Sequence, residues 1–209
     1  MTISRHIKFG SAGKLDSMKN SHIIKHFTAI VEAYVTHGFW VTIIFADNQF
    51  ESIRGDLTDL HAQLNITVRD EHVPEIERYN RTIKEQVRGN YNVLPYNHLP
   101  PVFIIKMVHN AVFWCNMFAL NGGTYQTQSL SELILNRKLN FNARCKVEFS
   151  EYVQTHEEHD NSMQTRTVGA IATRPSNDDG AYYFINLTTG HRINRRSWTS
   201  MPMPTSVIS

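Results

Sequence analysis

A long amphipathic helix is the feature that most constrains the fold of this chain. The helix is predicted from Pro74, a residue that suits a first helical turn because it needs no N–H partner there, to about Leu94. Its apolar residues recur at spacings of three and four, at Ile76, Tyr79, Ile83, Val87 and Tyr91. With 209 residues, the chain is long enough to bury a core against this apolar face.

A second face of the same helix carries charge. It begins with Glu77 and continues with Arg81, Lys84 and Arg88, again three or four residues apart. A carboxylate at the start of a helix, followed by three cations, can hold a metal ion and lead phosphates toward it. The alternative is a solvated Glu77–Arg81 pair, worth about 0.2–0.5 kcal/mol. The spacing by itself leaves both interpretations open.

The run Trp40–Ala46 is nearly continuous in β-branched and aromatic residues. It predicts a strand buried on both faces, as at the centre of an α/β sheet. Asp47 follows at the carboxyl end of this strand, where open α/β sheets place their sites. The alternative is that Asp47 only starts the turn that continues through Asn48 and Gln49.

Other local patterns predict the remaining helices and strands before residue 140. Caps, stops and apolar spacing predict a strand over 2–9, a helix from a Ser21 cap to a stop at Gly38, a short helix within 53–64, a strand over 65–68, a buried helix over 102–120, and a short helix to Leu135 with a Ser129–Glu132 capping box.

The composition changes after about Asn140. Short strands are predicted there, separated by the turn sequences Ser176–Gly180 and Thr188–Gly190; the strands are residues 145–154, 166–174, 182–187 and 192–198. The chain is therefore expected to be α/β over residues 1–140 and a small β-barrel over 141–200. The tail, residues 201–209, has no periodicity and is expected to be disordered.

Charge and cysteine usage limit the partners. The net charge is only +2, so any affinity for nucleic acid must come from local clusters of cations. Cys115 and Cys145 are isolated thiols, which favours a reducing, intracellular location (cytoplasm or nucleus) and no structural zinc site. No secretory signal is recognised, and polar residues interrupt the most apolar stretch, residues 102–120, so no membrane span is predicted.

Two basic clusters are candidate contacts to DNA. The first, on the long helix, comprises Arg78, Arg81, Lys84 and Arg88, with Glu85 as the acid among them. The second comprises Arg192, Arg195 and Arg196 beside Trp198, with no acid adjacent in sequence. Such clusters bind phosphates independently of base sequence. A solvated helix face and a charge-protected edge strand are the respective alternatives.

The segment His156-Glu-Glu-His-Asp160 combines metal-ligating residue types. It lacks the spacing that places two histidines on one helical face, and it falls in a predicted loop. It therefore does not predict a metal site.

Several motifs resemble the integrase of copia-type LTR retrotransposons, a part of the Pol polyprotein. Phe45-Ala-Asp-Asn-Gln-Phe-Glu51 is similar to the motif of the second catalytic acid, and Glu75-Ile-Glu-Arg-Tyr-Asn-Arg-Thr82 to that of the third. Phe113-Trp-Cys-Asn116 resembles the helix after the core, and segments from Val168 to Thr199 resemble the downstream barrel. The resemblance extends to about Pro204.

The resemblance implies a truncated ribonuclease-H-like integrase core followed by a small all-β barrel. It implies a polynucleotidyl transferase for DNA integration that uses Mg²⁺ or Mn²⁺, with Asp47 and Glu77 as two of the ligands, DNA as partner, and self-association as in integrases. Two such ions assist in-line displacement at phosphorus, and they prefer carboxylate oxygens.

The chain also departs from the family pattern. The first catalytic acid belongs on an opening strand expected upstream of Met1, and Asp16 lies in a loop-like context that does not suit the role. The spacing between Asp47 and Glu77 is short for the family, and Val73–Ile76 replaces its usual Asn-Gly turn. We therefore expect the chain alone to be inactive in strand transfer. A non-catalytic nucleic-acid-binding module and a protein-binding scaffold remain as alternatives.

Overall fold

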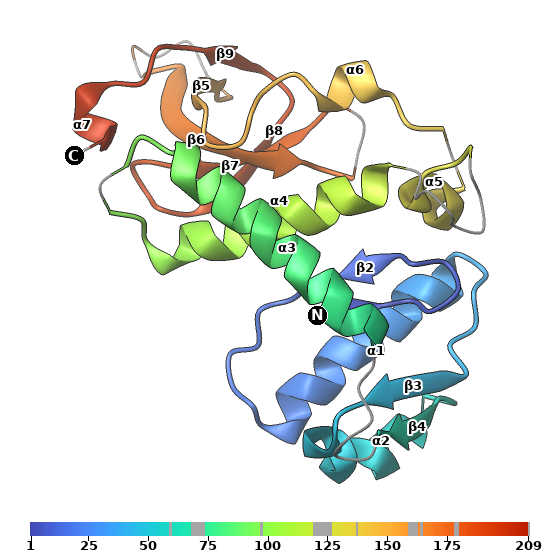
Figure 1. Cartoon of the computed structure of the whole chain (residues 1–209). Helices are drawn as coiled ribbons and strands as arrows, with labels where there is room; N and C mark the ends of the chain where they lie inside the picture. Colours follow the sequence, from blue (N-terminus) through green and yellow to red (C-terminus); the bar gives the residue numbers. More distant parts are fainter. Residues whose placement is uncertain are drawn as a thin grey trace. The chain divides into compact units, whose positions relative to one another are not determined.

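The computed structural model shows a mixed α/β protein (Figure 1). It describes residues 1–58, 60–67, 74–96, 98–118, 127–136, 138–158, 163, 165–177 and 180–208. The chain forms two compact units: unit 1 is Met1–Lys84 with Trp114–Lys138, and unit 2 is Glu85–Phe113 with Leu139–Ser209. Unit 2 thus combines residues 85–113 with everything described from Leu139 onward. The predicted domain division at residue 140 stays a prediction.

Unit 1 begins with a hairpin instead of the single strand predicted over 2–9. Strand β1 (Thr2–Ile3) pairs antiparallel with β2 (Gly10–Ser11). The chain reverses between them, and Lys8 adopts a left-handed φ of 64°. The sparse alternation of the sequence did not reveal this turn.

The rest of unit 1 contains a parallel strand pair with helices. Strand β3 (Ile43–Ala46) pairs with β4 (Gln63–Ile66), in register from Ile43 opposite Gln63 to Ala46 opposite Ile66. The helices are α1 (Asn20–Thr36), the 3₁₀ helix η1 (Asn48–Ile53) and α2 (Arg54–Thr58). The core comprises Ile23, Ala46, Ile53, Leu57 and Leu64.

Strand β3 is not buried on both faces, which corrects the prediction for Trp40–Ala46. Ile43 and Phe45 are 47% and 38% exposed, and Trp40, which precedes the strand, is 80% exposed. Ile44 and Ala46 contribute to the core. The strand therefore alternates between a covered and an open face. In the described chain it pairs with β4 alone.

The start of α1 also differs from its prediction. Lys19, not Ser21, occupies the N-cap position, and it makes no side-chain cap hydrogen bond. The stop is confirmed: Gly38 has φ of 82°, and its N–H donates to the carbonyl of Val35 at 2.9 Å.

Three helices agree closely with the sequence patterns. Helix α3 (Pro74–Val93) buries Tyr79 and Ile83 of its predicted apolar face. Helix α4 is Pro101–Met117, and α5 is Leu130–Leu135. The capping box of α5 is confirmed, because the Glu132 N–H donates to Ser129 Oγ at 3.1 Å and the Ser129 N–H donates to the Glu132 carboxylate at 2.9 Å.

Unit 2 is built on a five-stranded antiparallel sheet with the order β8-β7-β6-β5-β9. Its elements after residue 140 are α6 (Phe141–Arg144), β5 (Tyr152–His156), β6 (Thr167–Pro175), β7 (Tyr182–Asn186), β8 (Arg192–Arg195) and β9 (Trp198–Ser200). The first predicted strand, 145–154, was placed too early, because it overlaps β5 only at its last three residues. The next two predictions agree with β6 and β7, and the last one runs through residues that form both β8 and β9.

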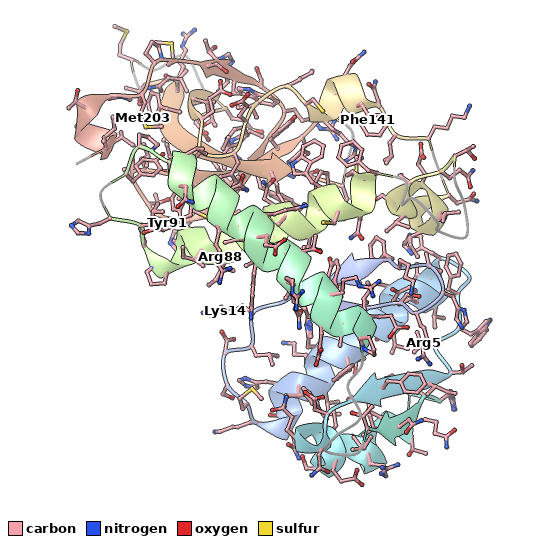
Figure 2. All side chains as sticks on the ribbon, viewed as in Figure 1. Arg5, Lys14, Arg88, Tyr91, Phe141 and Met203 are labelled. Atoms are coloured by element: carbon pink, nitrogen blue, oxygen red, sulfur yellow. The ribbon has the colours of Figure 1, made fainter. Side chains whose placement is uncertain are left out.

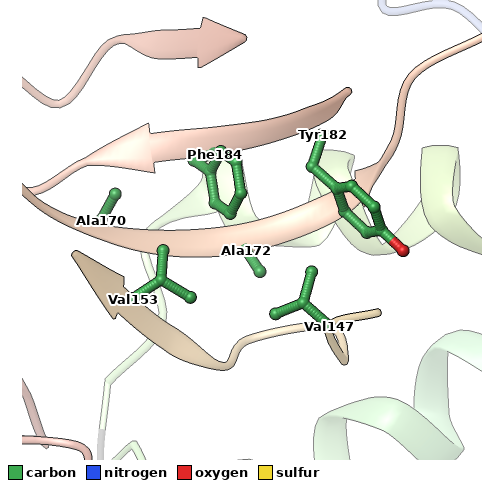
Figure 3. Packing of buried hydrophobic residues seen from close by; sticks show 6 residues of the cluster. All are labelled: Val147, Val153, Ala170, Ala172, Tyr182 and Phe184. Carbon is green, nitrogen blue, oxygen red and sulfur yellow. The ribbon is translucent and has the colours of Figure 1, made fainter. Parts of the chain in front are cut away.

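One face of this sheet carries an aromatic and aliphatic core, shown in Figure 3; its buried members are Val147, Val153, Ala170, Ala172, Tyr182 and Phe184. Ile193 and Trp198, from the two edge strands β8 and β9, pack against the same cluster. The Trp198 ring lies 4.9 Å from the Tyr182 ring and 5.4 Å from the Phe184 ring. Both edges therefore bend toward one core, and the sheet is strongly curved.

The opposite face of the sheet packs against α4 and the tail. Phe103 of α4 joins Tyr152, Ile171 and Ile185 in a second cluster. Met203, labelled in Figure 2, and Val207 pack against it, and residues Thr205–Ile208 form helix α7. The tail is therefore ordered over these residues, in contrast to the disorder predicted for 201–209. Met203 and Val207 anchor it to this cluster.

Candidate metal and nucleic-acid site

Asp47 lies where the sequence analysis placed it, directly after β3 at the carboxyl end of the parallel pair. It is exposed and has an extended backbone, with φ of −69° and ψ of 160°. Its carbonyl accepts a hydrogen bond from the Phe50 N–H at 3.0 Å, which starts η1. Its carboxylate makes no capping hydrogen bond to this helix. The turn interpretation thus accounts for the backbone of Asp47 but not for its carboxylate.

Glu77 lies in the first turn of α3, together with Glu75. The amino end of a helix stabilises carboxylates through its partial positive charge. The Glu77 side chain is exposed, as a ligand approached from solvent would need to be.

Arg5 connects the start of α3 to β3, a link that no local pattern predicts. Its guanidinium lies 4.7 Å from the centre of the Phe45 ring, and its Nε lies 3.4 Å from Oε1 of Glu75. A backbone hydrogen bond at Glu75 itself lowers the pKa of that carboxyl, as do the hydrogen bond and charge of Arg5 and the charge of Lys8. Figure 2 labels Arg5 in unit 1.

These contacts place the beginning of α3 beside the strand that Asp47 follows. Glu75 and Glu77, however, are two residues apart, so their side chains leave the helix about 200° apart. Arg5 therefore brings the two segments together without fixing the position of the Glu77 carboxylate. A shared metal site of Asp47 and Glu77 stays a prediction.

The four cations predicted on α3 are all exposed: Arg78, Arg81, Lys84 and Arg88. We call them the α3 basic face; Figure 2 labels Arg88. The helix turns its buried residues Tyr79 and Ile83 to the other side. The face therefore combines a rigid scaffold with accessible positive charge, as a phosphate contact requires.

The second predicted cluster separates into individual environments. Arg195 is ion-paired with Glu157: its Nε donates to Oε1 at 3.0 Å, and its Nη2 donates to Oε2. Arg192 and Arg196 are both exposed. The guanidinium of Arg192 lies 4.8 Å from the centre of the Tyr183 ring. The cluster thus has an acidic neighbour, Glu157, which strand pairing supplies and the local sequence of residues 192–196 did not show.

The first residues of the segment 156–160 make contacts with other side chains. His156 shares hydrogen bonds of 3.1 Å with Thr199 and with Ser197, one from each ring nitrogen. Glu157 is held by Arg195. His159 and Asp160 lie outside the described residues.

Asp16 lies 3.5 Å from Lys14 in an exposed pair. Over the described residues, no group of three or more His, Cys, Asp and Glu side chains is arranged to hold a metal ion. Nor does any described helix have both the length and the apolar character needed to cross a membrane.

The likenesses that comparison with known proteins gives are structural. No protein-family model matches the chain, and no curated protein matches it. Among solved structures, the chain is similar to one in a cryo-EM structure of the simian T-cell lymphotropic virus intasome in complex with PP2A regulatory subunit B56 gamma. The identity is 14%, the TM-score is 0.49, and the match covers 97% of this chain and 71% of the other.

Proposed function

We propose that this chain is an integrase-like, nucleic-acid-binding protein of the copia type, in which Asp47 and Glu77 bind Mg²⁺ or Mn²⁺. The observation that carries the proposal is the contact of Arg5 with both Phe45 and Glu75, because it joins the segments that hold the two acids. In this proposal, unit 1 is a ribonuclease-H-like core and the curved sheet of unit 2 is the small barrel.

The donor set fits a magnesium-type ion. Carboxylate oxygens are its preferred ligands, and Mg²⁺ commonly binds through one or two carboxylates while retaining several waters or taking substrate phosphates. Such an ion supplies charge stabilisation and nucleophile activation at a phosphodiester. The chain itself contributes the exposed carboxylates at the end of β3 and the start of α3.

The α3 basic face would orient DNA relative to these acids. Its cations lie on the same helix as Glu77, so a phosphate backbone along the helix would pass that carboxylate. Arg192 and Arg196 would add contacts from unit 2, while Arg195 would act mainly through its pair with Glu157. Self-association, as in integrases, belongs to the same proposal.

A non-catalytic nucleic-acid-binding module is the second candidate. It is favoured by the exposed cations of α3, which serve binding whether or not the two acids share a metal ion.

The metal proposal is tested by thermal unfolding of the full chain with Mg²⁺ or Mn²⁺. Saturation at about 100 times Kd would stabilise the protein by about 2.7 kcal/mol and raise Tm. Asp47→Asn and Glu77→Gln should each abolish this rise. Glu32→Gln, at an exposed carboxylate of α1, is the control and should keep it. A rise that persists unchanged in both site variants would refute the shared site.

DNA binding is tested by fluorescence anisotropy with a short duplex at several salt concentrations. Arg81→Gln and Lys84→Gln should weaken binding of all sequences similarly, and each should reduce the slope of log affinity against log salt by about 1. Lys25→Gln, an exposed cation of α1, is the matched control. Affinity that is independent of salt would contradict the α3 contact.

A further inference from the structure

Four basic side chains of unit 2 converge on the sheet face that α4 covers. Two are arginines held at one aromatic ring: the guanidinium groups of Arg174 on β6 and Arg192 on β8 each lie 4.8 Å from the centre of the Tyr183 ring on β7. Arg174 also lies 5.5 Å from the Phe113 ring of α4. Register explains the grouping, because Arg174 is directly opposite Tyr183 and Arg192 is two residues from its other partner, Asn194.

Helix α4 supplies the other two, Lys106 and His109. They are three residues apart and so lie on the same helical side, one turn beyond Phe103, which packs on this sheet face. Burial, followed by the charges of Arg192 and Arg174, lowers the pKa of Lys106. Burial, followed by the charges of Lys106, Arg174 and Arg192, lowers the pKa of His109. All four groups therefore act on one another.

This arrangement is electrostatically unfavourable without an anion. Burial is also the main cause that lowers the pKa of Arg174, and the charge of Arg192 adds to it. Within the described residues, none of the four is ion-paired with a carboxylate. The Tyr183 ring offsets part of the repulsion by cation–π contact, and it fixes both guanidinium groups at one place. Their remaining N–H donors are geometrically suited to phosphate oxygens.

We propose that Lys106, His109, Arg174 and Arg192 form a binding site for the backbone phosphates of a nucleic acid. The nucleic-acid part of this inference rests on the proposed function, whereas the anion site itself does not. A nucleic-acid backbone is favoured over a single phosphate because the cations come from one helix and two strands, which lets successive phosphates bind.

The site is coupled to pH through His109. Among the described residues, the charged groups that act on it are the cations Lys106, Arg174 and Arg192, and the last two share the Tyr183 ring. They oppose its protonation in the free protein. A bound phosphate offsets part of this positive charge and favours the protonated form of His109, so proton uptake by His109 accompanies anion binding. Affinity should therefore rise as the pH falls through the normal histidine range, about 6.5.

The anion site is tested with inorganic sulfate, which keeps its charge between pH 5.5 and 7.5. Sulfate at millimolar concentration, at constant ionic strength, should raise Tm of the full chain, with a larger rise at pH 5.5. Lys106→Gln and Arg192→Gln should each weaken sulfate binding about tenfold. His109→Gln should remove the difference between the two pH values. Lys146→Gln, an exposed cation of the same unit, is the control.

Equal sulfate responses in the protein, in Lys106→Gln and in Arg192→Gln would overturn the site. A pH dependence retained in His109→Gln would overturn the role of His109. Replacing Arg174 would also remove its contacts with the Phe113 and Tyr183 rings, so neither test uses an Arg174 variant.

The source of the phosphate is tested with a single-stranded oligodeoxynucleotide and an abasic phosphodiester of equal length. Both should bind about tenfold more weakly to Lys106→Gln and Arg192→Gln. If sulfate binding is lost in these variants but oligonucleotide binding is unchanged, the cluster is a small-anion site and its nucleic-acid role is refuted. That result would leave the proposed function standing, since the α3 variants test it separately.

Discussion

The strands of the sheets in the two units are buried to different extents. Strand β6 has a neighbour on each side, and Ala170, Ile171 and Ala172 are at most 1% exposed, so both of its faces are covered. Strand β3 has one described neighbour, and Ile43 and Phe45 are 47% and 38% exposed. Both strands are rich in apolar residues. The difference therefore lies in the layers around each strand and not in its own composition.

The two units also rely on different kinds of contact. Unit 2 is stabilised by rings packed in a curved sheet, as in the group Tyr182, Phe184 and Trp198. In unit 1, a polar clamp joins the hairpin to α4: Asn116 Nδ2 donates to the Gly10 carbonyl at 2.7 Å, and the Gly10 N–H donates to Asn116 Oδ1 at 2.9 Å. Truncation of an apolar ring in unit 2 and truncation of the polar Asn116 side chain in unit 1 should therefore lower the free energy of unfolding by different amounts.

The largest effect is expected from Phe184→Ala. Phe184 is fully buried, so its removal leaves a cavity and should lower the free energy of unfolding by about 3–5 kcal/mol. Phe45→Ala, on the open face of β3, should cost about 1 kcal/mol or less, mainly through loss of the Arg5 contact. Chemical denaturation of both variants measures the difference. Equal losses would show that the face of β3 is covered in solution.

A smaller effect is expected from Asn116→Ala. Asn116 is 5% exposed, and its loss leaves the N–H and the carbonyl of Gly10 without their partner. The free energy of unfolding should fall by about 2 kcal/mol, because buried unsatisfied polar groups are costly. Asn92→Ala, at an exposed position of α3, is the control. If both variants unfold at the same denaturant concentration as the parent, the clamp does not stabilise unit 1.

The smallest effect concerns Glu157 and Arg195. The hydrogen bond from Arg195 is the main cause that lowers the pKa of Glu157 below its ordinary value of 4.5. A carboxyl with a lower pKa in the folded state adds stability above its unfolded pKa, and this is lost as the pH falls through the folded pKa. Glu157→Gln should therefore cost about 0.5–1 kcal/mol at neutral pH.

That difference should vanish in strong acid, where both proteins carry a neutral group at position 157. Thermal unfolding of the parent and Glu157→Gln from pH 7 to pH 2 measures it. A constant difference across this range would mean that the ion pair adds no stability.

Local patterns predicted those features that depend on nearby residues. The period of α3 and the capping box of α5 are set by spacings of three and four, and both are confirmed. The strands of unit 2 followed from β-branched and aromatic runs between turns. For the candidate site, the sequence placed Asp47 at a strand end and Glu77 in a first helical turn, which is also where they lie.

The remaining features depend on distant partners. No local signal showed that Arg5 would meet Phe45 and Glu75, or that Arg174 and Arg192 would share the Tyr183 ring. Glu157 and Arg195 are 38 residues apart and meet through the pairing of strands. Such contacts arise from register and helix packing, which no single segment specifies.

Backbone preference and apolar period act within a few residues, so local sequence accounts for most of the helical and extended segments, such as α3 and the capped helix α5. Only the tertiary structure decided which faces became covered, which cations gained an acid, and which basic groups came together on unit 2. Burial and ion pairing depend on what the rest of the chain places around a residue, so the same arginine type is paired at position 195 and stacked on a ring at position 192.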